Sequence, residues 1–276
     1  MRLGRRGGHH SAAEAHIILP PRWTSFCIYT PEDLFNEVKE EVTLVGGTLS
    51  VDDSVEDKPY RDPQKSAFVG YFWSGKHKRT VKGINLITLY YTDLVGHSYP
   101  INFRIYDKRE GKTKNDYFRE MVLEVMQWGI KPTWVTGDSW YSSLDNLKFL
   151  RNEKVGFLFG VADNRKVSLE RGKLIQIKRL EIPESGLMVY LKEFGWVKVF
   201  CQLFKNEPRY YIMYQPTLAR LHHLTRAEFK QVHDEHWEIE CFHRVINQVC
   251  NIERFYVRDE QAIRNHFYCA LRAFGK

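Results

Sequence analysis

The sequence predicts an α/β fold, with a mixed sheet flanked by helices, and three observations point to it. Short β-branched and aromatic runs separated by turn residues recur through residues 43–161. Amphipathic helical segments follow some of these runs and dominate the chain after residue 225. A further group of short β-like runs fills residues 166–215, which predicts a mostly β insertion between two parts of one α/β domain.

Length and composition limit the classes of protein to which this chain can belong. A length of 276 residues supports one large domain or one and a half, and a hydrophobic content of 43% supports a sizeable core. The net charge of +7 favours a polyanionic partner. The five cysteines form no Cys-x-x-Cys pair, so we expect reduced thiols and a cytoplasmic location. No run of about 18 apolar residues predicts a membrane span, and the basic N-terminus lacks the apolar core of a secretory signal.

The first elements lead to a pair of aspartates. Residues 1–30 show no hydrophobic period and are expected to be disordered, and residues 31–41 are expected to form a short helix capped by Thr30. The β-like run at residues 43–51 then ends on Asp52-Asp53-Ser54. Taken alone, these residues are most simply a turn. They could also place a carboxylate at the end of a buried strand, where open α/β sheets bind their ligands.

The next segment begins with a polar, basic stretch. Residues 58–82 are expected to be mostly loop, close to any bound DNA. Residues 84–92 and 98–106 alternate as paired strands, with Gly96 in the turn between them. Apolar positions from Phe118 to Met126 predict an amphipathic helix that stops at Gly129.

A second acidic residue follows the next predicted strand. Residues 133–136 form a β-like run, and Asp138 comes two residues later. Asp138 could cap a helix that starts near Ser143, or it could be a second carboxylate at a strand end. A helix over residues 144–151 and a strand over residues 155–161 complete this part. The β-like runs of residues 166–215 are then expected to form a sheet layer attached beside the core.

Residues 225–257 are expected to form one long helix. Thr225 and Glu228 have the spacing of a capping box, and no Gly or Pro follows within the segment. The helix has an apolar stripe of Ile239, Phe242, Ile246 and Val249, and a polar row of His233, His236, Glu240, Arg244 and Asn247. Glu240 follows a core-facing residue, so it lies at the edge of the buried face. The polar row alone would suit a solvated helix face equally well. A last helix is expected over residues 258–276.

The sequence of residues 237–258 resembles that of the DDE transposases of bacterial insertion sequences. The third acidic residue of these proteins lies in a Tyr-x2-Arg-x3-Glu-x6-Lys signature. On this chain the Glu is Glu240, while His233, His236 and Asn247 stand at the Tyr, Arg and Lys positions. The neighbouring residues also match the family's sequence, at Phe242-His243-Arg244, Gln248 and Asn251-Ile252-Glu253-Arg254-Phe255. Gly137-Asp138-Ser139 resembles the second-Asp motif of this family, and Asp52-Asp53-Ser54 resembles its Asp-x-Ser/Thr at the first strand. The resemblance runs from about Val42 to the C-terminus.

The resemblance implies an RNase H-like fold and a metal-dependent reaction. The implied catalytic and metal-binding residues are Asp52, Asp138 and Glu240, with Asp53 as the alternative to Asp52. The implied cofactors are two Mg²⁺ ions, with Mn²⁺ as a substitute, because hard cations take carboxylate and phosphate oxygens. The implied reaction is phosphodiester cleavage at transposon ends, followed by transfer of the freed 3′-hydroxyl to target DNA.

The implied partner is double-stranded DNA, at the transposon ends and at the target, with a homodimer as the active form. The residues expected at DNA phosphates are Lys76, Lys78, Arg79, Lys82, Arg165, Arg244 and Asn247. Asn247 lacks the charge of the Lys that the family has there, so its contact should be weaker. Trp140, Tyr141, Trp196 and Trp237 are the aromatic residues of which one could stack on an extruded base.

The implied domain organisation has three parts. Residues 1–41 would be a disordered or remnant N-terminal region, residues 42–165 and 222–276 the RNase H-like catalytic domain, and residues 166–221 the insertion. Relatives extend further at both ends, so the chain is expected to be shortened at each. Two rival functions follow. One is an inactive remnant that only binds DNA, and the other is an RNase H-like nuclease without strand transfer.

Overall fold

Nine strands form one mixed sheet within residues 28–275, which the computed structural model describes. The strands of this sheet are β1 (Thr48–Asp57), β2 (Gly70–Ser74), β3 (Arg79–Thr92), β4 (Ser98–Ile105), β5 (Trp134–Gly137), β6 (Gly156–Val161), β9 (Leu187–Leu191), β10 (Gly195–Phe204) and β11 (Glu207–Tyr214). Their order is β2-β3-β1-β5-β6-β11-β10-β9, and β4 also pairs with β3. β1, β5 and β6 are parallel neighbours, and the other pairs are antiparallel.

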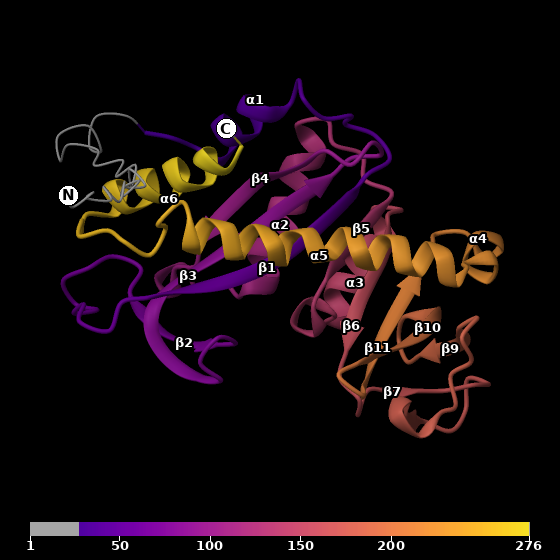
Figure 1. Ribbon diagram of the computed structural model, residues 1–276. Coiled ribbons are helices and arrows are strands. Elements are labelled where there is room, and N and C mark those ends of the chain that lie inside the picture. Colours follow the sequence, from indigo (N-terminus) through magenta and orange to yellow (C-terminus); the bar gives the residue numbers. More distant parts are fainter. Residues whose placement is uncertain (1–27, 276) are drawn as a thin grey trace, which may run out of the picture.

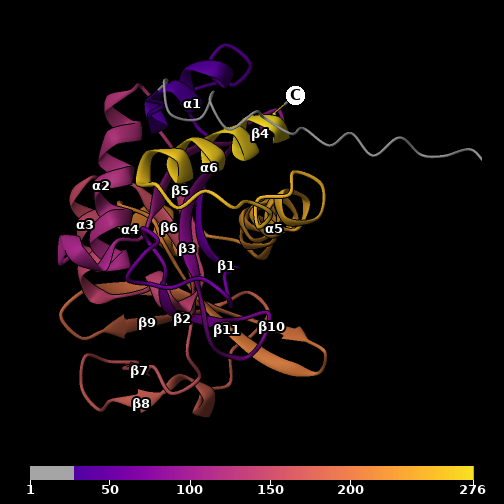
Figure 2. The ribbon, with the colours of Figure 1, turned by 90° about the vertical axis from the view of Figure 1, so that its left-hand side faces the viewer.

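Helices cover both faces of this sheet. They are α1 (Pro31–Val38), α2 (Lys114–Gln127), α3 (Leu144–Asn152), α4 (Leu218–His223), α5 (Arg226–Gln248) and α6 (Glu260–Phe274). Short 3-10 turns lie at η1 (Lys108–Glu110), η2 (Ser139–Tyr141) and η3 (Ile177–Arg179), and β7 (Lys166–Val167) pairs with β8 (Ile175–Gln176) apart from the main sheet. Figure 2 shows α2 and α3 on one side of the strands and α5 on the other.

The alternation of apolar residues along the strands explains the two layers. On β3, Ile87 and Leu89 belong to the core under α2 and α3, while Ile84 and Leu86 belong to the core that α5 and α6 cover. Ile239 of α5 and Phe267 of α6 are fully buried in this second core. A sheet that is buried on both faces fits the predicted α/β class.

Most of the predicted elements are present. Thr30 caps α1 through a capping box with Asp33, and Thr225 caps α5 through one with Glu228. The strands expected at residues 84–92 and 98–106 are paired as β3 and β4. The helices expected near residues 118–126, 144–151 and 258–276 are present as α2, α3 and α6. The loop expected over residues 58–82 is interrupted by β2 and by the start of β3.

Two predicted boundaries are wrong. The first strand does not end before Asp52, because pairing with β3 continues to Asp57 and places Asp52 opposite Thr88 within β1. The long helix ends at Gln248 rather than near Val257. Asn251, three residues beyond this end, takes a φ of 54°, a left-handed conformation that Asn tolerates.

The β-rich insertion continues the main sheet rather than forming a layer beside it. β11 pairs with β6 through five residues, Tyr210–Val161 to Tyr214–Phe157, and β10 and β9 follow outward. α5 runs across the sheet from α6 to α4, as Figure 1 shows, so one helix spans the core and the insertion. At the insertion end, Phe229 of α5 stacks on Phe200 of β10 with ring centroids 4.8 Å apart.

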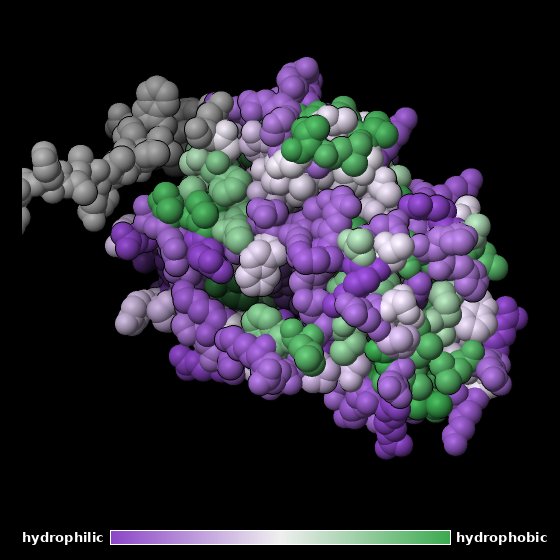
Figure 3. Space-filling model, turned by 45° about the vertical axis from the view of Figure 1, so that its right-hand side comes forward, coloured by the Kyte–Doolittle hydropathy of each residue, from purple (hydrophilic) through white to green (hydrophobic). Residues whose placement is uncertain are grey.

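The face in Figure 3 is mainly polar, and the described cysteines are unpaired. Figure 3 shows a face on which hydrophilic side chains dominate and apolar ones gather in separate patches. No helix among the described residues is long and apolar enough to cross a membrane. Cys201, Cys241, Cys250 and Cys269 are all free thiols. Cys27 and residues 1–27 as a whole, where disorder was expected, lie outside the described part of the chain.

Candidate active site

Two aspartates lie side by side on neighbouring parallel strands. Val51 of β1 pairs with Gly137 of β5, so Asp52 and Asp138 are the next residues along each chain. Gly137 allows this close approach, since a Cβ there would meet Val51 Cγ1 at 2.7 Å. Asp138 ends its strand and caps η2, accepting a hydrogen bond of 2.9 Å from the amide of Trp140. The pair therefore lies where β5 stops and β1 runs on.

Asp52 and Asp53 point to opposite faces of the sheet, as adjacent residues on a strand must. Asp52 faces α5, where its Oδ2 lies 3.1 Å from Nδ1 of His243. Asp53 faces α2, where three side chains donate hydrogen bonds to it. Its carboxylate accepts hydrogen bonds from Lys114 at 2.6 Å, Asn85 at 2.7 Å and the Tyr141 hydroxyl at 3.1 Å. Only Asp52 shares a face with the helix that carries Glu240.

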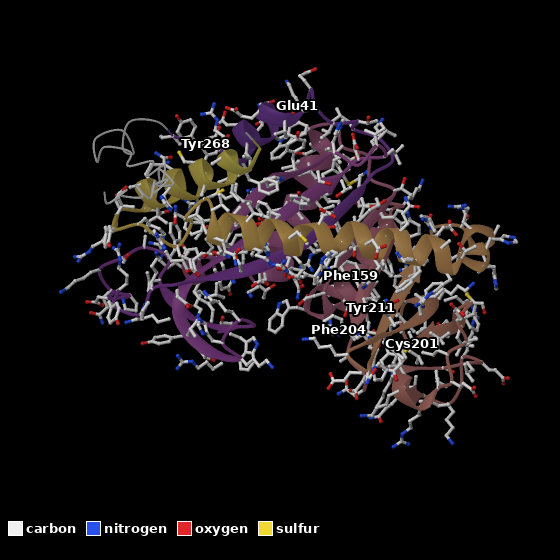
Figure 4. The ribbon with its side chains drawn as sticks, in the orientation of Figure 1. Glu41, Phe159, Cys201, Phe204, Tyr211 and Tyr268 are labelled. Atoms are coloured by element: carbon white, nitrogen blue, oxygen red, sulfur yellow. The ribbon has the colours of Figure 1, made fainter. Side chains whose placement is uncertain are left out.

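Glu240 stands at the boundary between the core and an open pocket. Ile239 before it is fully buried, while Glu240 itself is exposed. The pocket has a volume of about 630 Å³ and lies between α5, the end of β5 and the β10–β11 hairpin. In Figure 4, Phe204 and Tyr211 of this hairpin are labelled close to α5. The pocket is lined by Gly137, Asp138, Ser139, Gly160, Val161, Asp163, Gln202, Leu203, Phe204, Pro208, Arg209, Tyr210, Tyr211, His233, Asp234, His236, Trp237, Glu238 and Glu240.

The charge of Asp52 affects the ionisation of the other two predicted acidic residues. Burial raises the pKa of Asp138 to about 6, and the charge of Asp52 adds to this. Burial also raises the pKa of Glu240, again with a contribution from the charge of Asp52. The side chains of Asp138 and Glu240 are reachable from the open pocket even though protein atoms surround much of each carboxyl group. We call these three carboxylates the acidic wall. Asp138 and Glu240 line the pocket, whereas Asp52 is not among its lining residues.

Asp52 differs from the other two acids because it has a cationic neighbour. Burial alone would raise the pKa of Asp52, but the hydrogen bond and the charge of His243 hold it below its usual value. In return, Asp52 raises the pKa of His243 against the opposing effect of burial. The pair is mutually stabilised in its charged form, so Asp52 is kept ionised.

His243 is the site residue that the sequence reasoning did not assign a role. The signal was present, because positions 236, 240 and 243 are four and three residues apart and share one helix face. His236, also on this face, lines the pocket, and its Nδ1 is buried without a hydrogen-bond partner. Burial lowers the pKa of His236 to about 4, so the Arg position of the family signature holds a neutral imidazole here.

The predicted DNA contacts of the basic loop and Arg244 lie at the surface. Lys76, Lys78, Arg79 and Arg244 are exposed, and Lys82 is half-buried. Lys76 already pairs with Glu253 at 3.3 Å.

Arg165 and Asn247 point partly inward. Arg165 is half-buried and donates to the carbonyl of Ser142 at 3.5 Å. The amide of Asn247 donates to the carbonyl of His243 in its own helix at 2.9 Å, and its Oδ1 is buried without a partner. Asn247 is therefore turned toward its helix rather than held out toward solvent.

The four aromatic residues considered for base stacking fall into different environments. Tyr141 is fully buried, and Trp196 is half-buried at the start of β10. Trp140 is 61% exposed, with the ammonium of Lys114 5.4 Å from its ring centroid. Trp237 is 47% exposed and lines the pocket beside Glu240. Trp140 and Trp237 are thus the two with a free ring surface next to the acidic wall.

The described residues contain no group of three or more His, Cys, Asp or Glu side chains placed to enclose a metal ion among them. An all-protein cage of the structural-zinc kind is therefore absent from this part of the chain. The acidic wall instead offers carboxylates on an open pocket with raised pKa values at Asp138 and Glu240. This donor set fits Mg²⁺, which uses one or two carboxylates and keeps water and phosphate oxygens as its remaining ligands.

Comparison with known proteins gives one extensive match. The family model described as "Transposase DDE domain" matches residues 52–274. No curated protein matches the sequence. Among solved structures, this chain is similar to the Drosophila P element transposase strand transfer complex, with 8% sequence identity and a TM-score of 0.23. That match covers 47% of this chain and 32% of the other, so this chain matches about a third of the P element protein's length.

Proposed function

Because this chain belongs to the family of transposase DDE domains, we propose that it cleaves DNA at the ends of a mobile element and joins the freed 3′-hydroxyl to target DNA. The fold is RNase H-like, a mixed sheet flanked by helices. The observation that supports the chemistry is the acidic wall of Asp52 and Asp138 on adjacent parallel strands, with Glu240 across from them on α5.

The proposed catalytic residues are Asp52, Asp138 and Glu240, which would hold two Mg²⁺ ions or, in their place, Mn²⁺. When bound, such ions lower the pKa of an attacking water and balance the charge on the leaving oxygen. The raised pKa values of Asp138 and Glu240 support this assignment, because crowded carboxylates gain most from a cation. Asp52 is preferred over Asp53, whose carboxylate is already satisfied by three donors on the other face.

The remaining side chains of the site position these acids and the DNA. His243 holds the carboxylate of Asp52 ionised and oriented. Arg244 is exposed four residues after Glu240, where it can hold a phosphate near the scissile bond. Lys76, Lys78, Arg79, Lys82 and Arg165 are the proposed contacts to the flanking duplex, with Asn247 as a weaker one. We also propose that a homodimer is the active form, because two ends must be joined to one target.

The deciding experiment is cleavage of the element's own terminal repeats. Labelled duplexes carrying these repeats and the flanking DNA are incubated with the chain in Mg²⁺, in Mn²⁺ and in EDTA, together with a supercoiled target plasmid. The proposal expects metal-dependent nicks at the repeat boundary and end-joined target products, all absent with Asp138→Asn.

The other outcomes separate the rival functions. Cleavage without joined product would identify a nuclease, and binding of the repeats without cleavage would identify an inactive remnant. Light scattering of the DNA complex tests the dimer, which a 1:1 complex would exclude.

A further inference from the structure

The β2–β3 ribbon carries two exposed aromatic rings that the proposed active site does not use. β2 is the first strand in the order of the main sheet and lies at the lower left of Figure 1. Its side chains alternate cleanly. Tyr71 and Trp73 are 62% and 64% exposed, while Phe72 and Ser74 between and after them are 6% and 3% exposed. Phe72 anchors the strand inward, with its ring edge-on to Tyr106 at 5.8 Å. The two exposed rings therefore stand on one face of a fixed strand.

Positive charge surrounds these rings. Tyr71 pairs directly across the ribbon with Lys82, and directly opposite residues share a face. The turn of the ribbon adds Lys78, which is exposed. Arg79 is also exposed, but it pairs with Ser74 and so lies on the opposite face of the ribbon. None of Lys78, Arg79 and Lys82 forms an ion pair with another residue in the described part of the chain. These three charges remain available to a ligand.

We infer that the outer face of this ribbon binds an unpaired DNA strand, with successive bases stacked on Tyr71 and Trp73 and phosphates held by Lys82 on the same face and by Lys78 at the turn. This inference rests on the proposed function and names a second substrate form for it, single-stranded rather than duplex DNA. Residues two apart on a strand are separated by about 6.6 Å, a spacing that an extended single strand can match base by base. Stacking on aromatic rings in a basic groove is the general mode of single-strand binding.

The same surface is poorly suited to a second copy of this chain. β2 is an edge strand, and an open edge can pair with another edge. Here Lys108 donates to the edge carbonyl of Tyr71 at 3.2 Å, where a partner strand would have to place an amide. The unpaired charges of Lys78, Arg79 and Lys82 would face their own copies across such a contact. Both features oppose self-pairing and favour a polyanion.

The test is binding of a labelled oligo(dT) of twelve nucleotides and of a duplex of equal length, measured by fluorescence anisotropy in EDTA. Tyr71→Ala and Trp73→Ala are each expected to weaken oligo(dT) binding roughly tenfold and to leave duplex binding unchanged within about twofold. Trp73→Phe keeps a ring and should recover most of the affinity. Tyr256→Ala, which removes another exposed ring that is 94% accessible, is the matched control and should change neither. Lys82→Ala should reduce the salt dependence of oligo(dT) binding by a slope of about 0.7.

Three outcomes would overturn the inference. One is oligo(dT) binding that is unaffected by both aromatic substitutions, and another is an equal loss for oligo(dT) and duplex. The third is a change in self-association by sedimentation with no change in DNA binding, which would make the ribbon a contact between copies. Because binding is measured without metal, a chain that fails to cleave its terminal repeats can still pass this test. A chain that cleaves but ignores the aromatic substitutions refutes only the inference.

Discussion

Nδ1 of His243 lies 3.1 Å from Oδ2 of Asp52 and joins the C-terminal part of α5 to the middle of β1. The contact links one proposed metal ligand to the helix that carries another, Glu240. It also sets the ionisation of Asp52, whose pKa stays low despite the burial that would raise it. The position and the charge of Asp52 therefore both depend on its contact with one imidazole.

Replacing His243 with Phe should move the pH dependence of cleavage. Without the imidazole, burial raises the pKa of Asp52. Asp52 then loses its proton only at higher pH, so the acidic limb of the rate profile shifts upward. Loss of such a positioning partner should also raise the Mg²⁺ requirement by roughly 10- to 100-fold. Both are measured by pH–rate profiles at several Mg²⁺ concentrations. His266→Phe, a half-buried imidazole bonded to the Ile252 carbonyl, is the control, and an unshifted profile for His243→Phe would contradict the assigned role.

Asp52→Asn and Asp53→Asn should differ in their effect on cleavage. Asp52→Asn should abolish cleavage, and because it leaves the buried His243 without its charged partner it should also lower the free energy of unfolding. Asp53→Asn removes the charge that Lys114 faces at 2.6 Å in a mostly buried setting, so it should lower stability by about 1–3 kcal/mol and leave some cleavage. Urea unfolding and cleavage assays on both variants check this. Full activity of Asp52→Asn with none for Asp53→Asn would reverse the assignment of the first ligand.

The Asp52–Asp53 question shows what sequence alone could and could not decide. The acidic pair, the β-like run before it and the resemblance to the family could all be recognised in the sequence. Which carboxylate faces α5 depends on strand register, and one residue of slip exchanges the two faces. β1 also runs past the pair because β3 continues beside it to Asp57, a tertiary pairing that no local pattern reports. His243 was missed for a related reason, since its partner is remote in sequence.

The longer-range parts of the fold were the harder ones to predict. Capping boxes at Thr30 and Thr225 act within one turn, so both helix starts were predicted correctly. The end of α5 at Gln248 had no strong local signal, because neither Gly nor Pro, which usually mark a helix end, follows within residues 249–257. The short β-like runs at residues 166–215 were recognisable in the sequence. Their pairing with β6 was not, so we predicted a separate layer where the structure has one continuous sheet.

Glu56→Gln should increase stability above neutral pH. Glu56 is fully buried, its Oε2 has no hydrogen-bond partner, and burial raises its pKa from 4.5 to about 7. The folded state thus holds its proton more tightly than the unfolded state, so wild-type stability falls as pH rises from about 4.5 to about 7. The variant does not lose stability in this way, so at pH 8 its free energy of unfolding should exceed that of the wild type by up to about 3 kcal/mol.

Thermal and urea unfolding between pH 4 and pH 8 measure this difference. Glu184→Gln, at an exposed carboxylate, is the control and should follow the wild type throughout. A constant difference between Glu56→Gln and wild type across the range would show that Glu56 does not titrate in this window.

Asn247→Lys should raise cleavage of terminal DNA. The substitution removes a buried Oδ1 that has no partner. It also adds a long side chain whose charged end can reach solvent while its stem stays packed. A charge-assisted contact to phosphate is about twice as strong as the neutral one that Asn can offer, so we expect a several-fold higher rate at low salt and a smaller gain at high salt.

The control for this substitution adds the same charge on a different side of the helix. Gln248 is exposed and lies one position further along, about 100° round the helix axis. Gln248→Lys should leave the rate nearly unchanged. Equal gains from both variants would mean that net charge, rather than the position of residue 247, governs the rate.

The pairing of β11 with β6 sets how this protein can be re-engineered. Deleting residues 166–221 would leave β6 as an exposed edge strand, with Phe157 and Phe159 beside unpaired backbone amides. An exposed edge strand is prone to aggregation, so the truncated chain should precipitate rather than fold. Chimeras between relatives should instead be spliced at the tip of the β10–β11 hairpin, where Lys205 and Asn206 turn with positive φ and no strand is severed.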